Sequence, residues 1–389
     1  VLGYFTQFTE FKILSISLGH FFHDIYTSIL APMLPLLIDK LGITMAMAGI
    51  MDVVRKSPTL LNPLFGLIAD KICIKYIIIL TPAITAICMS LLGLMPSYLF
   101  VLLLLFVAGI SSALFHIPSP VLIKKYAQHR TGSGMSFYML GGEFSRSVGP
   151  VIITAAISWW GLEGSWRIMP LGIIASLFLY FKLNDIKKET KPDAKSLDEK
   201  ALIFLKRYIY LLAGIGGFIL FQAGIKLSLS LYLPVYLVKH GYSLWFAGIS
   251  LSVLQLAGAT GVVIAGFLSD IIGRKKTLII TSLLCPILMF LFINSTAVWQ
   301  ILLLILLGIC IFAPGPVILA MVQDTNTTRP SLLNSIYMTI SFGVSSLMAL
   351  LIGIVADNFT IDISFKLCAY LSLLAIPVAL MLPLNYKQK

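Results

Sequence analysis

Apolar runs of about 20 residues or more follow one another along almost the whole chain. A run of this length can cross the hydrocarbon core of a bilayer as a helix. With 59% hydrophobic and only 11% charged residues, a chain of 389 residues has too few charges to coat a water-soluble globule. The alternating polarity of transmembrane β-barrel strands is missing from these runs. The sequence therefore predicts an all-α polytopic membrane protein.

The apolar runs form two groups of six, separated by a polar segment rich in Lys, Asp and Glu. The predicted spans are 11–38, 44–69, 76–95, 98–123, 132–160 and 165–183 in the first group, and 207–238, 243–270, 276–294, 297–322, 331–357 and 361–384 in the second. The polar segment contains Pro192 and lacks an apolar face, as is typical of a solvated linker. We expect an N-terminal six-helix bundle over 1–184, a linker over 185–206 and a C-terminal six-helix bundle over 207–389.

The distribution of basic residues predicts the orientation of the chain. Most of the 28 Lys and Arg residues fall in the terminal segments, in the linker and in the loops after even-numbered spans. By the positive-inside rule, this side faces the cytoplasm, so both termini and the linker are expected there, with the protein in the cell inner membrane. The net charge of +12 then belongs to a membrane protein's cytoplasmic surface, and no nucleic-acid partner is expected. No cleavable signal peptide is apparent, because the first apolar run contains His20 and Asp24.

The two groups of spans also carry an internal repeat. Gly42 and Gly49 in the first group are followed 199 residues later by Gly241 and Gly248 in the second. A charged loop after the second span of each group repeats as well: Gly66-Leu-Ile-Ala-Asp70 is echoed by Gly266-Phe-Leu-Ser-Asp270. Matching positions at a nearly constant spacing indicate two related halves.

The repeated loop resembles the G-x-L-A-D-x-x-G-R-K signature of the major facilitator superfamily. The second copy continues with Gly273, Arg274 and Lys275, whereas the first has Cys73 and Ile74 where the signature has Gly and Arg. The resemblance covers essentially the whole chain. It implies twelve transmembrane helices in two pseudo-symmetric six-helix bundles and secondary transport by alternating access. In the superfamily this loop latches the cytoplasmic ends of the two halves, which implies a cytoplasmic gate formed by Gly66, Asp70, Lys75, Gly266, Asp270 and Arg274.

Further motifs resemble the fosmidomycin-resistance branch, whose members export small anionic or amphiphilic compounds in exchange for protons. They are Gly19-His20-Phe-Phe-His23-Asp24-Ile-Tyr26, Leu114-Phe115-His116-x-Pro118 and Arg130-Thr-Gly132-Ser-Gly134. In the fifth span, Gly141-Gly142 and Gly149-Pro150 partly match a helix signature of proton-coupled exporters. The same glycines and proline are equally consistent with close helix packing and a kink.

Ionisable residues inside the predicted spans are the candidates for function. A charge at the centre of a bilayer costs about 3 kcal/mol even on mild scales, so each needs a partner, water or a functional role. Asp24, Glu143, His20, His23 and His116 are the candidate proton-coupling residues, and His20 and Asp24 lie four apart on one helix face. The candidate substrate-binding residues are Arg55, Arg146, Lys226, Tyr26 and Gln222. Asp52 with Arg55 or Lys56, and Glu143 with Arg146, are spaced so that they can instead form structural ion pairs.

Together with the resemblance, which implies export, these residues predict a proton-coupled transporter of a small anionic or amphiphilic organic compound, with proton and substrate competing for the same charged groups. Uptake of an organic anion or siderophore by proton symport is one alternative, and a metal-ion transporter using His20, His23, Asp24 and His116 is another. An enzyme is not expected, because H-E-x-x-H, G-x-S-x-G and a fixed metal-ligand spacing are all missing. The expected energy source is the proton gradient, with no cofactor and no resident metal. We expect a monomer whose partners are the substrate, protons and lipid.

Overall fold

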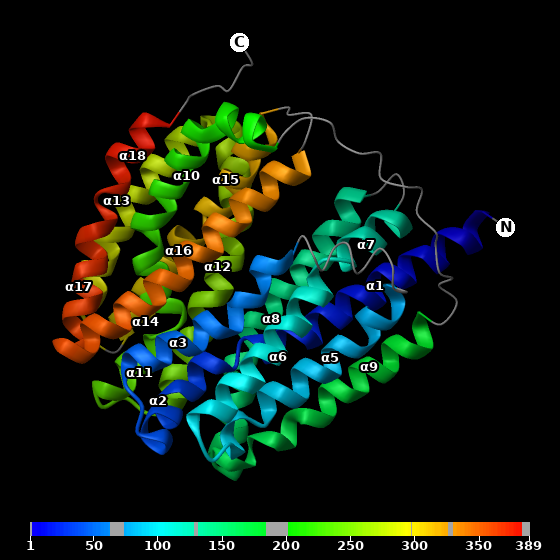
Figure 1. The fold of residues 1–389 in the computed structure, drawn as a ribbon, viewed down its shortest axis with the longest axis horizontal. Coiled ribbons are helices and arrows are strands. Elements are labelled where there is room, and N and C mark those ends of the chain that lie inside the picture. The colour runs from blue at the N-terminus through cyan, green and yellow to red at the C-terminus, as the bar shows by residue number, and fades with distance from the viewer. Residues whose placement is uncertain are drawn as a thin grey trace. The chain divides into compact units, whose positions relative to one another are not determined.

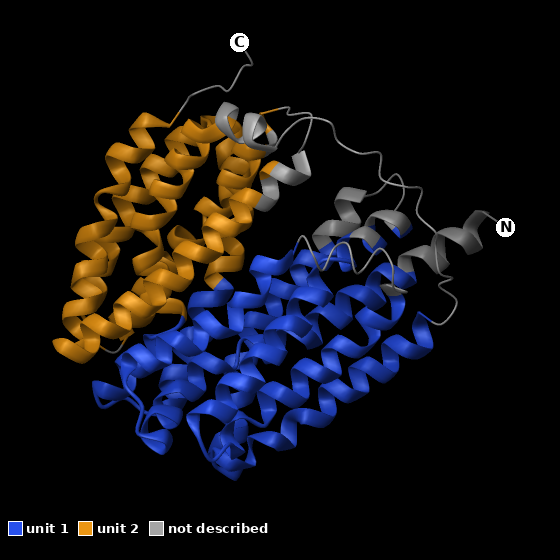
Figure 2. Ribbon diagram, in the orientation of Figure 1, with its two compact units in different colours: residues 1–189, 231–256 blue, residues 190–230, 257–389 orange. Residues whose placement is uncertain are grey.

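The computed structural model describes residues 2–62, 74–127, 131–183, 201–296, 298–325 and 330–382. Within these ranges every regular element is a helix (Figure 1), as the apolar runs predict. The helices pack into two compact units, which Figure 2 draws in different colours.

Unit 1 comprises residues 1–189 and 231–256. Its helices are α1 (Leu2–Thr27), α2 (Leu30–Leu41), α3 (Met45–Lys56), α5 (Ile74–Ser90), α6 (Tyr98–His116), α7 (Ser119–Ala127), α8 (Thr131–Trp160), α9 (Met169–Lys182) and α11 (Leu233–Lys239), together with the first half of α12 (Leu244–Ile272). Short 3₁₀ helices lie at Ser57–Leu61, Leu92–Leu94 and Glu163–Ile168. Helix α1 packs along α8, and α5 packs between α6 and α9.

Unit 2 comprises residues 190–230 and 257–389. It contains α10 (Ala201–Ser230), the second half of α12, α13 (Arg274–Ile293), α14 (Val298–Phe312), α15 (Pro314–Gln323), α16 (Pro330–Asn358), α17 (Ile361–Ser372) and α18 (Ala375–Met381). Its core is an aliphatic and aromatic cluster around Ile215, Phe218, Leu278, Val317 and Leu333.

Residues 231–256 pack with unit 1, although the sequence places them in the second bundle. Helix α11 lies against α2, and the Tyr232 hydroxyl donates a hydrogen bond to the carbonyl of Met45 over 3.3 Å. The predicted boundary at 185–206 is placed at the polar linker, whereas the two compact units are defined by which helices pack together. The division into bundles over 1–184 and 207–389 therefore stays a prediction.

Ten helical segments in the described ranges are long and apolar enough to cross a membrane. The two predicted spans outside this set are 44–69, which runs into residues outside the described ranges, and 132–160, which forms the continuous helix α8. Helix α8 carries Glu143 and Arg146 near its middle.

Two spans that carry candidate residues are broken beside them. In the first, α1 ends at Thr27 and α2 begins at Leu30, so the break follows Asp24 by one turn. In the fourth, α6 ends at His116, just before Pro118, whose ring cannot donate a helical hydrogen bond. The helix therefore opens directly after His116. Breaks at membrane depth are tolerated where the freed backbone groups find partners inside the protein.

The internal repeat is also visible in local structure. Gly42 and Gly241, 199 residues apart, both adopt a left-handed backbone, with φ of 59° and 83°. Each is followed by the same helix start: Thr44 Oγ1 accepts a hydrogen bond from the Met47 N–H (3.2 Å), and Ser243 Oγ accepts one from the Phe246 N–H (3.1 Å). A hydroxyl that caps the free N–H groups at a helix start stabilises it.

Substitution of either turn glycine by alanine should lower stability. A left-handed backbone costs a residue with a Cβ about 1 kcal/mol, whereas the added methyl itself would meet open space at both Gly42 and Gly241. We expect Gly42→Ala and Gly241→Ala each to lower the midpoint of thermal unfolding of the detergent-purified protein. Gly343→Ala is the matched control, since Gly343 lies in helix α16 with open space around it and no positive φ. An unchanged midpoint in both turn variants would contradict this account of the turns.

Candidate functional site

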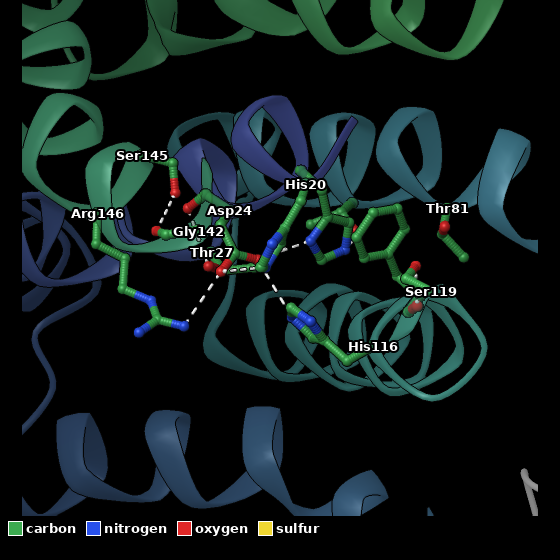
Figure 3. A network of polar contacts seen from close by, with 12 residues as sticks. His20, Asp24, Thr27, Thr81, His116, Ser119, Gly142, Ser145 and Arg146 are labelled. Atoms are coloured by element: carbon green, nitrogen blue, oxygen red, sulfur yellow. Dashed lines mark hydrogen bonds and ion pairs between the residues drawn. The ribbon is translucent and has the colours of Figure 1, made fainter. Parts of the chain in front are cut away.

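A network of charged and titratable side chains lies inside unit 1, where α1, α6 and α8 meet (Figure 3). Helix α1 supplies His20, His23 and Asp24, helix α6 supplies His116, and helix α8 supplies Glu143 and Arg146. Each of the five predicted proton-coupling residues belongs to this network. The structure brings them together from sequence positions more than 100 residues apart.

Asp24 is the centre of the network. Its side chain is 1% exposed and is surrounded by three imidazoles and one guanidinium. Oδ1 lies 2.9 Å from Nδ1 of His23 and 3.2 Å from Nε2 of His116. Oδ2 lies 3.4 Å from Nε2 of His20 and 3.2 Å from Nη2 of Arg146. A buried carboxylate needs such partners, because removal from water otherwise costs several kcal/mol.

Arg146 joins the two carboxylates of the network. Its Nη1 donates to Oε1 of Glu143 over 2.8 Å, one helical turn away, while Nη2 donates to Asp24 on the neighbouring helix. The side chain of Arg146 retains 37% of its exposure, and that of His116 retains 36%. The network is therefore buried at Asp24 and open at Arg146 and His116. The predicted pair of Glu143 with Arg146 is present.

Uncharged partners hold the histidine rings. Nδ1 of His20 lies 2.8 Å from the backbone carbonyl of Tyr138, and the two rings stack with centroids 4.0 Å apart. The ring of His23 stacks on Phe115 at 4.5 Å, and its Nε2 lies 3.1 Å from Oγ1 of Thr85 on α5. Thr85 donates in turn to Ser111. No sequence signal marks Thr85 or Ser111, because hydroxyl residues are common in membrane helices and the partners of these two lie on other helices.

Glycines on α8 allow α1 to approach closely enough for these contacts. A methyl group added at Gly142 would collide with the imidazole of His20, and one at Gly141 would lie 2.5 Å from the carbonyl oxygen of Ser17. A methyl group at Gly149 would lie 2.7 Å from the carbonyl oxygen of Ile25. Small residues at helix interfaces in membranes have this packing role. Close packing thus accounts for the glycines of the fifth span.

The other predicted ion pair is present on α3. Oδ1 of Asp52, whose side chain is buried, accepts from Nη2 of Arg55 over 2.7 Å, and its Oδ2 lies 2.6 Å from Nζ of Lys56. Nη1 of Arg55 also reaches the carbonyl of Thr27 at the end of α1, at 3.4 Å. This pairing ties α3 to the break in the first span.

Of the remaining predicted substrate residues, Tyr26 lies in unit 1 outside the Asp24 network, and Gln222 and Lys226 belong to unit 2. The Tyr26 hydroxyl is buried, donates to the carbonyl of Ile168 over 2.6 Å and accepts from the N–H of Gly172 over 2.9 Å, so it fastens α1 to the start of α9. Lys226 and Gln222 lie on α10 in unit 2, where Nζ of Lys226 stands 4.9 Å from the centroid of the Phe312 ring. Within unit 1 the structure thus brings Arg146, but not Tyr26, to Asp24.

The predicted gate is described only in part. Gly66 and Asp70 lie outside the described residues, and Nζ of Lys75 stands 5.0 Å from the centroid of the Tyr76 ring. In the second copy, Arg274 pairs with Asp270 one turn away at 2.5 Å, and its Nε donates to Oδ2 of Asp324 over 3.3 Å. Gly266 has open space around its Cα.

His20, Asp24 and His116 are also the only described set of three metal-ligand side chains whose donor atoms all lie within 4.8 Å of one another. His and Asp are ligands of divalent transition metals. However, the guanidinium of Arg146 already bonds the same carboxylate, so a metal ion there would face a positive charge. The arrangement therefore favours proton binding over metal binding.

A polytopic helical membrane protein with a buried carboxylate, three histidines and an arginine on broken helices has the features of a secondary transporter. The family model of the Major Facilitator Superfamily matches residues 16–331 and 263–389. The chain belongs to this superfamily, whose members are multi-pass transporters of small molecules and not enzymes. The resemblance seen in the sequence is thereby confirmed.

Relatives match along nearly the whole chain. The fosmidomycin resistance protein of Escherichia coli (strain K12) is 26% identical over 386 residues, which cover 97% of this chain and 94% of that protein. The MFS-type transporter YfnC of Bacillus subtilis (strain 168) is 23% identical over 389 residues, 96% of this chain and 93% of that protein. The multi-drug resistance efflux pump PmrA of Streptococcus pneumoniae is 22% identical over 296 residues, 73% of each chain.

Solved transporters share the fold. A bacterial homologue of the human lysosomal transporter Spinster, in an inward-facing and occupied conformation, superposes with a TM-score of 0.80 at 14% identity, covering 95% of this chain and 96% of that chain. A D-xylose-proton symporter gives a TM-score of 0.77 at 17% identity, covering 96% and 97%.

Enlarging Gly142 should displace His20 from Asp24. We expect Gly142→Ala to reduce substrate flux in proteoliposomes at least about tenfold, because loss of position by about 1 Å is enough to cost this much at a functional site. Gly224→Ala is a matched control on α10, where the three atoms nearest to the added methyl belong to the side chains of Cys368 and Met348, at 3.0 to 3.2 Å. Full flux in Gly142→Ala, at equal expression and monodispersity, would show that the His20 contact is not needed.

Proposed function

We propose that this chain is a proton-coupled exporter in a bacterial inner membrane, with both termini in the cytoplasm. It moves a small anionic or amphiphilic organic compound outward in exchange for protons, by alternating access between two six-helix bundles over 1–184 and 207–389. The observation that carries this proposal is the Asp24 network, in which a buried carboxylate contacts three imidazoles and a half-exposed guanidinium. Proton-binding and anion-binding groups are in direct contact there.

Asp24, Glu143, His20, His23 and His116 are the proton-binding groups in this proposal, and Arg146 is the first substrate-binding group. Arg55 and Lys226 are further candidate cations for an anionic substrate. Exchange requires that a proton and the substrate exclude each other from the site. A substrate group that donates a hydrogen bond to Asp24 has this effect, because it occupies the carboxylate oxygen that the proton needs.

The names of the relatives support export. One is a fosmidomycin resistance protein and another a multi-drug resistance efflux pump. Export by exchange with protons is consistent with both names, and fosmidomycin is the natural first probe for this chain.

Uptake by symport is the second candidate, and one contact favours it. Arg146 bonds both carboxylates, so protonation of Asp24 would free its guanidinium for an anion. If the substrate binds through Arg146 alone, proton and anion then assist each other's binding, which is the linkage of a symporter. A metal-ion transporter remains the third alternative, with His20, Asp24 and His116 as donors.

The pH dependence of binding separates these functions. If one proton is displaced by the substrate, the affinity of the purified protein for fosmidomycin rises with pH, by up to about tenfold per pH unit between pH 6 and 8. In Asp24→Asn the affinity should no longer depend on pH, because the site then lacks the carboxylate that stabilises a proton on Asp24 itself or on the imidazoles beside it. Isothermal titration calorimetry measures both. Asp39→Asn, which removes an exposed carboxylate on α2, is the control and should keep the wild-type slope.

The other outcomes distinguish the remaining candidate functions. An affinity that falls as pH rises identifies symport, and an affinity independent of pH in the wild type removes Asp24 from the coupling mechanism. Binding of Zn²⁺ at micromolar concentration that is lost in both His20→Asn and His116→Asn would favour the metal transporter.

The gate assignment has its own test. Arg274 pairs with Asp270 and Asp324 at the cytoplasmic side that the sequence predicts, so Arg274→Gln should weaken these contacts without reaching the Asp24 network. We expect the rate of fosmidomycin flux in proteoliposomes to change severalfold while the equilibrium affinity stays within about twofold. Lys276→Gln, two residues along α13, is the control for the lost charge. A large loss of affinity in Arg274→Gln alone would contradict a role in gating.

A further inference from the structure

The hydrogen bonds between His23 and the backbone of α5 can run in only one direction. The carbonyl oxygen of Thr81 can only accept, so Ser111 donates its hydroxyl proton to it over 2.9 Å. The hydroxyl of Thr85 then donates to Oγ of Ser111, also over 2.9 Å. Its proton is thereby used, and Oγ1 of Thr85 can only accept from Nε2 of His23, 3.1 Å away. Nε2 of His23 therefore carries a proton.

With Nε2 of His23 protonated, the contact between His23 and Asp24 requires a further proton. A neutral imidazole that is protonated at Nε2 has only a lone pair at Nδ1. Nδ1 of His23 nevertheless lies 2.9 Å from Oδ1 of Asp24, which is hydrogen-bond distance. Two lone pairs repel each other in this geometry, so a proton lies between them. The pair consists either of an imidazolium and a carboxylate or of a neutral imidazole and a carboxylic acid.

His20 is arranged differently. Its Nδ1 lies 2.8 Å from the carbonyl oxygen of Tyr138, which can only accept, so the proton of a neutral His20 is on Nδ1. Nε2 is buried and makes no hydrogen bond to any described residue; it faces Oδ2 of Asp24 at 3.4 Å. That separation is longer than the His23 contact, as expected for two acceptors without a proton between them. Nε2 of His20 is thus a vacant proton position.

His116 needs no additional proton. Its Nε2 can donate to Oδ1 of Asp24 at 3.2 Å, while Nδ1 faces the hydroxyl of Tyr138 at 3.4 Å, which can donate. Among the described residues of unit 1, the charged and titratable groups of this network are Asp24 and His23 from α1, His116 from α6, and Tyr138, Glu143 and Arg146 from α8. Arg55 of α3 lies at the end of α1.

The net charge of the Asp24 network agrees with one proton shared by His23 and Asp24. Asp24 and Glu143 carry two negative charges and Arg146 one positive charge, so without further protons the cluster is negative by one. The proton shared by His23 and Asp24 makes it neutral, which is the favoured charge inside a bilayer. A second proton on His20 makes the net charge positive by one, which is unfavourable inside a bilayer, so this second proton is the one that is released.

We propose that the Asp24 network retains one proton between His23 and Asp24 throughout transport and exchanges a second proton at Nε2 of His20. Thr85 and Ser111 are positioning residues, because their hydroxyls fix which nitrogen of His23 is protonated. The exchange during transport rests on the proposed function, whereas the two proton positions rest on the hydrogen bonds alone.

The proton positions are measurable by solid-state nuclear magnetic resonance of the ¹⁵N-histidine-labelled protein in liposomes, with His20→Asn and His23→Asn used to assign signals. We expect Nε2 of His23 to stay protonated from pH 5 to 9, and His20 to change from protonation at Nδ1 alone to protonation at both nitrogens as the pH falls. An unprotonated Nε2 on His23, or His20 and His23 titrating together, would overturn the proposal.

A variant of the hydroxyl chain tests the stated cause. Ser111→Ala leaves Thr85 without its acceptor, so Thr85 can donate to Nε2 of His23 instead. We then expect His23 to become a neutral imidazole protonated at Nδ1, and the retained proton to be lost. Thr85→Ser keeps the hydroxyl and should give the wild-type spectrum. An unchanged His23 signal in Ser111→Ala would remove Thr85 and Ser111 from the mechanism.

The pH dependence of fosmidomycin binding tests the exchange step independently of the spectra. His20→Asn should abolish the pH dependence of fosmidomycin affinity, which in the wild type amounts to up to about tenfold per pH unit. Wild-type pH dependence in His20→Asn would overturn the exchange step. If the spectra agree but wild-type affinity and flux do not respond to pH, the proton positions stand and the proposed function fails.

Discussion

The buried carboxylate of Asp24 is the constraint on which the arrangement of unit 1 depends. A lone carboxylate inside a bilayer is costly, so Asp24 requires cations and hydrogen-bond donors around it. These come from three helices: His20 and His23 from its own helix, His116 from α6 and Arg146 from α8. Helix α8 can approach α1 this closely because Gly141 and Gly142 remove side-chain volume from α8. The close packing of α1 and α8 thus also brings the charged groups of the site together.

The breaks in the helices belong to the same arrangement. The first span is interrupted one turn after Asp24, and α6 ends at His116, so both imidazole-bearing segments lie beside non-helical backbone. Such breaks are points at which a helix can bend, and here they adjoin the groups whose charge changes with a proton. A proton added to the cluster changes its net charge by one unit, and inside a membrane this is a large change in electrostatic energy. A small chemical event can therefore favour one helix arrangement over another.

Much of the fold follows from the sequence because it rests on local or periodic patterns. The apolar runs predict the membrane helices, and the spacing of 199 residues predicts the matching turns at Gly42 and Gly241. Ion pairs three or four residues apart, such as Glu143 with Arg146, were also predictable, since the helix itself sets that distance. The contact of Asp324 with Arg274 was not, because those residues come together only through the packing of α15 and α13.

The sequence by itself determined the membrane environment, the helical architecture, the internal repeat and the set of ionisable residues that a bilayer must accommodate. Only the tertiary structure decided which of these residues meet. It joined Arg146 and His116 to Asp24 and placed Thr85 and Ser111 next to His23. It also paired the Tyr26 hydroxyl with backbone groups of the 3₁₀ helix Glu163–Ile168 and of α9. The physical reason is that helix periodicity fixes neighbours within one helix, whereas contacts between helices depend on side-chain volume and the angle of approach.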